Sequence, residues 1–466
     1  MSWRPAIVLL AIVVVSQQHA SAHIGSPDVF VEAQAGPYRL LVTVRPPHAI
    51  PGIADVEVLA TSDDVRDVRI VPLPLTGPGA RFAPVADRTK RSAEDPRLFT
   101  GHLWLMSAGA WQVRVTVAGD RGEGTLSVPV PTLPQSTLAM TTGLRVTLFA
   151  LMMLLAAGFV GIVSALAREA RLGAGETIDR RARWRGRIAG AVATLVVGGI
   201  VFLGNMWWSV EASSYARYVY KPLTMAPRVT ESWLRLELRD PGWIGSRRLD
   251  DFIPDHGHRM HLFVVSPSLD RLWHLHPNET TTGEFAQRLP EMPAGQHEMF
   301  ADLVHATGVS ETVTGQLDAA AIQGAPLAGD DSGWAEGAPS DGAKIVWVRD
   351  DTPLVTKRLT MLTFRVEDAN GQPARDLELY MGMPGHAIVM RRDLKVFAHV
   401  HPSGSAPMAA MNIAMPRAES HASHEVAPPS TVTFPYGFPQ PGAYRVFVQV
   451  KRGGRVITEV FDADVK

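Results

Sequence analysis

Two long apolar segments dominate the hydropathy pattern of this chain. Residues 143–167 carry a single charged side chain, Arg145, and residues 188–208 carry none. About 20 apolar residues are enough for a helix to cross the hydrocarbon core of a bilayer, so both segments are predicted to be transmembrane helices. The residues between them, 168–187, contain seven arginines and three acidic residues. By the positive-inside rule this loop is cytoplasmic, and both flanking regions lie outside.

A shorter apolar run lies at residues 6–15, between Arg4 and the small residues Ala20-Ser21-Ala22. This layout is typical of a cleaved signal peptide, here residues 1–22. It agrees with the topology expected from the two helices. The sequence therefore predicts a protein of the bacterial inner membrane whose large domains lie on the periplasmic side.

The remaining sequence alternates short apolar and polar stretches between proline and glycine clusters. In residues 23–142 such alternation predicts strands near 38–44, 55–60, 65–72, 102–106 and 111–118, which is typical of a small β-sandwich. Two further β modules are expected at 213–320 and 345–466. Residues 321–344, rich in Gly, Ala, Asp and Ser, are expected to be a flexible linker.

A common closing strand connects the three modules. In each module a glycine (Gly109, Gly295 or Gly442) is followed two residues later by Trp111, His297 or Tyr444, and apolar alternation continues from there. The predicted fold class is therefore mainly β, with three immunoglobulin-like β-sandwich modules and two transmembrane α-helices inserted after the first.

Composition narrows the chemistry. The chain contains no cysteine, which excludes disulfides, zinc–thiolate sites, iron–sulfur clusters and cysteine nucleophiles. The net charge is −1, so no basic field indicates nucleic acid as a partner. A soft metal in such a protein would have to be bound by histidine and methionine.

The second and third modules carry the same pattern of histidine and methionine at a constant offset of 125 residues. The pattern comprises His256, His258, His261, His274 and His276 in the second module, and Met381, Met383, His386, His399 and His401 in the third. Histidine and methionine replace each other mainly as copper ligands, and thioethers favour Cu(I). These ten residues are candidate metal ligands, with copper as the expected ion and zinc as a possible one.

Strand geometry predicts how one such site would form in each module. His274 and His276 project from the same side of a strand, and His261 lies across the hairpin from them. His256 and His258 would form another same-side pair if their segment is extended. The methionines suggest that the third module prefers Cu(I) more than the second does. The alternative is that these histidines only form hydrogen-bonded ends of strands, with proline ending each strand.

Other histidines are weaker candidates. Cleavage of the signal peptide would leave His23 first in the mature chain, where its amine and imidazole can chelate a metal. His48 or His102 would complete such a histidine brace. His297 and His305 are possible extra ligands of the second module.

A segment after Pro402 resembles the copper-capturing loops of periplasmic copper proteins, or is a disordered loop in which these residues are incidental. Its candidate residues are Met408, Met411, Met415, His421 and His424.

The His-x-His-Pro hairpins and the closing strands resemble the FixH/YtkA-like family of membrane-anchored immunoglobulin-like domains. An N-terminal histidine on a sandwich is similar to CopC-type periplasmic copper carriers. These resemblances imply copper delivery or the assembly of metalloproteins such as cytochrome oxidase. This chain departs from single-domain relatives by its three modules and two membrane helices.

The predicted function is a membrane-anchored copper-binding protein that is not an enzyme and acts in copper homeostasis, resistance or delivery to cuproproteins. Its expected partners are the metal ion, the lipid bilayer and a cuproprotein or an oxidase assembly protein. Two alternatives stay open: a histidine-brace copper enzyme, and an interaction module without a metal. No Gly-x-Ser-x-Gly or HExxH motif supports a hydrolase.

Overall fold

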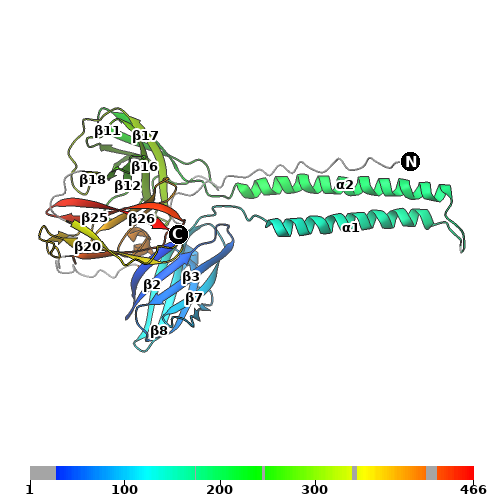
Figure 1. The fold of residues 1–466 in the computed structure, drawn as a ribbon, viewed down its shortest axis with the longest axis horizontal. Helices are drawn as coiled ribbons and strands as arrows, with labels where there is room; N and C mark the ends of the chain where they lie inside the picture. The colour runs from blue at the N-terminus through cyan, green and yellow to red at the C-terminus, as the bar shows by residue number, and fades with distance from the viewer. Residues whose placement is uncertain (1–27, 174, 244–246, 338–343, 416–427) are drawn as a thin grey trace.

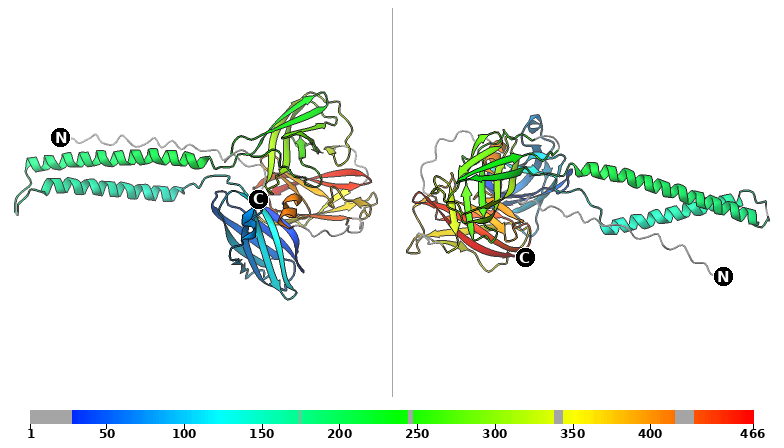
Figure 2. Two further views of the ribbon diagram at one scale, coloured as in Figure 1. Left: turned by 180° about the vertical axis from the view of Figure 1, so that it is seen from behind. Right: turned by 90° about the horizontal axis from the view of Figure 1, so that it is seen from above.

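The computed structural model describes residues 28–173, 175–243, 247–337, 344–415 and 428–466. Three β modules gather at one end, and two long antiparallel helices project from them (Figures 1 and 2). The predicted signal peptide, His23, His421 and His424 lie outside the described residues.

Module 1 (residues 29–132) contains two antiparallel sheets, with strand orders β1-β2-β3-β7-β6 and β5-β4-β8-β9. Side chains of both sheets form one apolar core, in which Val42, Val58 and Val115 are fully buried. Its strands are β1 (Val29–Ala35), β2 (Tyr38–Arg45), β3 (Gly52–Ala60), β4 (Val65–Pro74), β5 (Asp87–Arg88), β6 (Lys90–Arg91), β7 (Leu98–Leu105), β8 (Gly109–Gly119) and β9 (Gly122–Thr132), with a short 3-10 helix at Pro78–Arg81.

The two helices are α1 (Thr142–Glu169) and α2 (Arg180–Ala216). The side chains of Thr141 and Asp179 accept hydrogen bonds from the first turns, which fixes where each helix begins. Both helices are long and apolar enough to span a membrane, and their apolar side chains are largely exposed in the molecule. They contain the two spans expected from the hydropathy pattern.

Module 2 (residues 224–335) has sheets of order β10-β11-β15-β14 and β17-β16-β12-β13-β18. The last strand, β18, pairs with β13 and lies inside residues 321–344. The expectation of a flexible linker is therefore wrong for this part, which completes a sheet. The strands are β10 (Thr224–Thr230), β11 (Trp233–Arg239), β12 (His261–Val265), β13 (Arg271–Leu275), β14 (Asn278–Thr281), β15 (Glu284–Arg288), β16 (Gly295–Val304), β17 (Ser310–Ala319) and β18 (Ser332–Ala335).

Module 3 (residues 344–465) has one sheet of order β19-β20-β24 and a second in which β21, β25, β22 and β23 follow one another and β26 also pairs with β25. A short helix, α3, carries Met411 into the apolar core of module 1, so this methionine has a packing role. The elements are β19 (Lys344–Val348), β20 (Thr360–Glu367), β21 (Leu377–Glu378), β22 (His386–Arg391), β23 (Phe397–Val400), α3 (Met408–Ala414), β24 (Thr431–Tyr436), β25 (Gly442–Arg452) and β26 (Arg455–Val465).

The repeated sequence patterns have repeated backbone conformations. Gly109, Gly295 and Gly442 open β8, β16 and β25 with φ of 133°, 136° and 134°, a region that favours glycine. His256 and Met381 likewise share a positive φ, at 51° and 50°. The closing strand predicted in each module is therefore confirmed as a structural repeat.

Modules 2 and 3 contact each other through a shared apolar core, separate from the core inside each module. Its buried residues come from both modules, and the rings of Phe300 and Phe397 stack at a centroid distance of 4.8 Å. Burial of such side chains stabilises the contact by about 1.5–3 kcal/mol each. This interface fixes the two histidine hairpins against each other.

Candidate metal centre

The two predicted hairpins meet in one histidine cluster between modules 2 and 3. Each ring has another ring within a centroid distance of 5.1 Å, and the contact of His261 with His399 at 5.3 Å joins the rings into one group. The sequence suggested one site per module, whereas the structure forms a single continuous cluster. Its members are His256, His258, His261, His274, His276, His386, His399 and His401.

One triad lies entirely in module 2. His261 opens β12, while His274 and His276 lie on and just after β13. One ring nitrogen of each lies within 4.8 Å of those of the other two. The predicted hairpin geometry of this triad is confirmed, because His274 and His276 share a face and His261 lies across from them.

Hydrogen bonds fix which nitrogen of each ring in this triad is free. His261 donates from Nε2 to the carbonyl of Asp255 at 3.0 Å, and His276 donates from Nδ1 to Asp331 at 3.0 Å. His274 donates from Nδ1 to the side-chain oxygen of Gln449 at 2.9 Å. Such anchoring of the second nitrogen is the usual support of metal-binding histidines.

The nitrogens left over point toward one another. Nδ1 of His261 and Nε2 of His274 are 3.3 Å apart. Since the opposite nitrogens already carry the protons, both facing atoms present lone pairs. Nε2 of His276 is buried without a hydrogen-bond partner among the described residues. Three lone pairs thus converge where a cation would bind.

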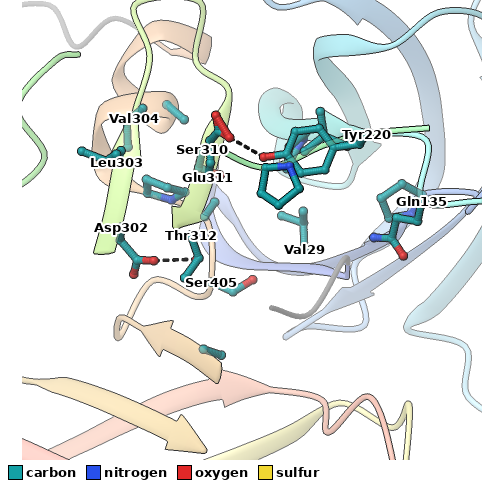
Figure 3. A pocket seen from close by; sticks show the side chains of 18 of the residues that line it. Val29, Gln135, Tyr220, Asp302, Leu303, Val304, Ser310, Glu311, Thr312 and Ser405 are labelled. Carbon is teal, nitrogen blue, oxygen red and sulfur yellow. Dashed lines mark hydrogen bonds between the residues drawn. The ribbon is translucent and has the colours of Figure 1, made fainter. Parts of the chain in front are cut away.

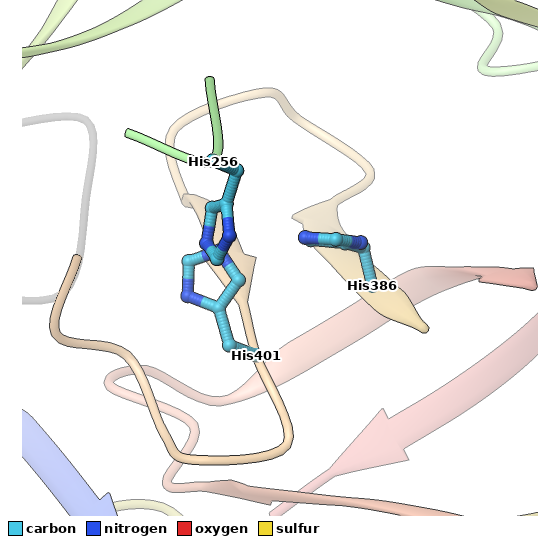
Figure 4. A group of neighbouring side chains, drawn as sticks. All are labelled: His256, His386 and His401. Atoms are coloured by element: carbon cyan, nitrogen blue, oxygen red, sulfur yellow. The ribbon is translucent and has the colours of Figure 1, made fainter. Parts of the chain in front are cut away.

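The other triad is shared between the modules. His256 of module 2 lies with His386 and His401 of module 3, again with one nitrogen of each within 4.8 Å of the others (Figure 4). Nε2 of His256 and both nitrogens of His386 are buried and have no hydrogen-bond partner in the described part of the chain, and the ring of His401 is buried beside them. This cross-module triad was not expected from sequence.

The turn at residues 255–258 explains why His256 crosses to module 3. Asp255 and His258 form a two-way backbone hydrogen-bonded turn, and His256 has a positive φ. The expected extended same-side pair of His256 and His258 is therefore wrong. His258 instead stacks on His276 at 4.0 Å and contacts Asp330 at 3.2 Å.

Met381 and Met383 occupy the equivalent turn of module 3. The carbonyl of Met381, rather than its sulfur, accepts a hydrogen bond from Nδ1 of His256 at 3.1 Å. The side chain of Met381 is buried beside this contact. Coordination by the two sulfurs stays a prediction.

His399 lies between the triads. Its ring is 4.6 Å from that of His401 and 5.3 Å from those of His386 and His261. Nε2 of His399 is buried without a partner among the described residues, while Nδ1 lies 3.5 Å from Asp302. His399 is therefore placed to serve either triad.

Burial keeps the central imidazoles neutral. Burial lowers the pKa of His261 and His274 well below 6.5, and neighbouring histidines lower it further. The pKa values of His386 and His401 fall well below 6.5 for the same two reasons. Neutral imidazole is the form that binds metals.

Acidic residues around the cluster were missed by sequence reasoning. Asp331 holds His276, Asp330 contacts His258, and Asp302 lies beside His399. Asp330 and Asp331 fall in the segment expected to be a linker, so no motif marked them. Their carboxylates favour a cation at the cluster.

The other candidate histidines do not join the cluster. His48 and His102 contact Gln135 and Asp55. His297 packs against Trp273. His305 lies between Asp251 and Glu311. The remaining partner of the proposed brace, His23, lies outside the described residues.

Comparison with known proteins identifies one family model. A domain of unknown function (DUF8832) matches residues 338–466, essentially module 3. No curated protein matches the chain.

The chain is also similar to several solved structures at low TM-score. A tetra-tandem repeat in the extending region of a large adhesion protein is 9% identical, and the match covers 90% of this chain and 72% of that chain at a TM-score of 0.16. Salmonella alpha-2-macroglobulin reacted with methylamine is 10% identical, and the match covers 93% of this chain and 24% of that chain at a TM-score of 0.22. Dimeric latent PorU from Porphyromonas gingivalis is 8% identical, and the match covers 90% of this chain and 32% of that chain at a TM-score of 0.15. The chain thus spans less than a third of the length of these last two proteins.

Proposed function

We propose that this protein is a membrane-anchored, periplasmic copper-binding protein that acts in copper homeostasis, resistance or delivery to cuproproteins. In this proposal the helices anchor three immunoglobulin-like sandwiches of the FixH/YtkA-like kind to the inner membrane. Modules 2 and 3 together bind two ions, one in each triad.

The observation that carries the proposal is the set of free imidazole nitrogens buried in the cluster. An unpaired buried polar group costs about 1–3 kcal/mol unless a ligand or a bound water satisfies it. Several such groups together approach the entire stability of a domain, about 5–15 kcal/mol. The facing lone pairs of His261 and His274 add repulsion that only a proton or a cation removes. A metal ion in each triad relieves both costs.

The donor type favours copper. Three neutral imidazoles suit Cu(I), Cu(II) and zinc, and among the divalent ions Cu(II) binds a given nitrogen site more tightly than zinc or the earlier first-row metals do. We further propose that the thioether of Met381, whose carbonyl contacts His256, favours Cu(I). Zinc is the competing ion, and a direct titration separates the two.

The test is elemental analysis of the full-length protein in detergent after loading with Cu(I) under reducing conditions. We expect about two ions per chain, one for each triad. A His386→Ala/His401→Ala variant should lose about one of them, and a His261→Ala/His274→Ala variant should lose the other.

His297→Ala is the matched control, because His297 is buried in module 2 but lies outside the cluster. It should keep the full copper content. Equal copper in the wild type and all variants would show that the metal binds elsewhere. Wild-type protein without copper would refute the proposal.

A further inference from the structure

A large cavity connects the histidine cluster with the base of the helical hairpin. It encloses about 1180 Å³. Its walls include the segments that join module 1 to α1 and α2 to module 2. Gln135 and Tyr220 of these segments line it (Figure 3), and so does Val219. They also include His261 and the histidines of β23 and its end. One hollow therefore reaches from the membrane-proximal linkers to the candidate ligands.

The histidines in this wall all belong to the cluster. His401 is 2% exposed and belongs to the triad with His256 and His386. His399 presents an unpaired Nε2, and His261 belongs to the module 2 triad. Because these rings border the cavity, an ion inside it can pass to either triad without opening the apolar interface.

Charge along the cavity favours a cation. Asp302 accepts a hydrogen bond from Thr312 at 2.6 Å and lies 3.5 Å from His399. Asp255 also lines the cavity, 3.8 Å from Nε2 of His256. The arginine in the wall, Arg259, is paired with Glu279, which offsets its charge. Two carboxylates thus line the cavity beside the imidazoles.

A second approach to the cluster lies on its opposite side. It leads over His258, whose side chain is 29% exposed. There Lys451 lies 3.4 Å from Asp330, which offsets its charge as Glu279 offsets that of Arg259.

We infer that the cavity is the path by which the metal ion enters and leaves the histidine cluster. The donor or recipient of the ion therefore approaches from the side of the transmembrane helices. This inference rests on the proposed function, since it concerns the same ion and the same ligands.

The test uses the natural absence of cysteine. Ser310 lines the cavity near Tyr220 (Figure 3) and is not a candidate ligand. A Ser310→Cys variant is treated either with a small methylthio reagent or with a bulky thiol reagent. Lys451→Cys, treated in the same two ways, blocks the approach over His258. The readouts are the copper content of the loaded protein and its rate of Cu(I) release to a soluble chelator.

The bulky group at position 310 should slow release by about tenfold or more relative to the methylthio group, with unchanged copper content, because it obstructs a path and removes no ligand. Both forms of Lys451→Cys should release copper at the same rate. Equal rates at position 310, or a selective effect at position 451, would overturn the path while leaving copper binding intact. Wild-type protein without copper would refute the proposed function and the path together.

Discussion

At the scale of residues, the centre depends on proton positions. Each ring of the module 2 triad donates a hydrogen bond from one nitrogen: His261 to Asp255, His274 to Gln449 and His276 to Asp331. The sequence predicted the shared face of His274 and His276, because strand periodicity fixes it. It did not predict these acceptors, since Gln449 lies on β25 of the other module and no local pattern marks it.

Gln449 offers a direct test of this orienting role. Its amide nitrogen donates to Ser332 at 2.8 Å, which turns its oxygen toward His274. Gln449→Leu removes the acceptor and should weaken copper affinity by about 10–100-fold. Competition with a chelator of known affinity measures the change. Gln316→Leu, on the exposed side of β17, is the control and should bind like wild type. Unchanged affinity in Gln449→Leu would remove the orienting role.

At the scale of elements, the sequence predicted the two helices but missed β18 and the turn of His256. The helices were predictable because an uncharged apolar run of about 20 residues is typical of a membrane-spanning helix. β18 was not, since four residues in a Gly/Asp-rich stretch give no periodic signal and gain order only by pairing with β13. The turn of His256 was also missed, because its positive φ is set by the two-way hydrogen bonds of residues 255 and 258.

The helical hairpin should depend on Gly186. A Cβ at this position would lie 2.9 Å from the carbonyl oxygen of Ser164, and Gly186 and Gly190 follow the small-xxx-small spacing of membrane helix pairs. Gly186→Leu should therefore lower the thermal unfolding midpoint in detergent, with a cost of about 1–3 kcal/mol. Gly198→Leu is the control, because nothing lies within 4 Å of a Cβ there. Equal midpoints for the two variants would contradict this packing.

His305 should make the stability of module 2 depend on pH. Burial lowers its pKa, but the hydrogen bonds that its ring donates to Glu311 and Asp251 outweigh burial and raise the pKa above 6.5. The ion pairs then contribute fully below pH 6.5, and their contribution is lost as pH rises through the raised pKa. The stability difference between wild type and His305→Gln, from urea unfolding, should shrink between pH 6 and pH 9.

His297 is the control, because its pKa shifts in the opposite direction from that of His305. Burial lowers its pKa, so its contribution is present above pH 6.5 and is lost as pH falls below that value. The difference between wild type and His297→Gln should therefore not shrink as pH rises. Parallel pH profiles for the two variants would contradict the assignment of charge to His305.

At the scale of the whole molecule, the cluster exists only because modules 2 and 3 dock. The duplicated pattern was visible in the sequence, and so were the three closing strands. The docking was not, because it depends on the apolar faces around Phe300 and Phe397, which read as ordinary strand interiors. The cross-module triad follows from that docking, and so does the cavity that reaches it.

The most direct test of the central claim is X-ray absorption spectroscopy at the copper edge of the loaded full-length protein. We expect about three nitrogen ligands per ion at roughly 2.0 Å, with the outer-shell scattering of imidazole rings. The spectrum should change when His386 and His401 are replaced by alanine. A first shell without imidazole scattering, or one that the double variant leaves unchanged, would contradict the histidine centre.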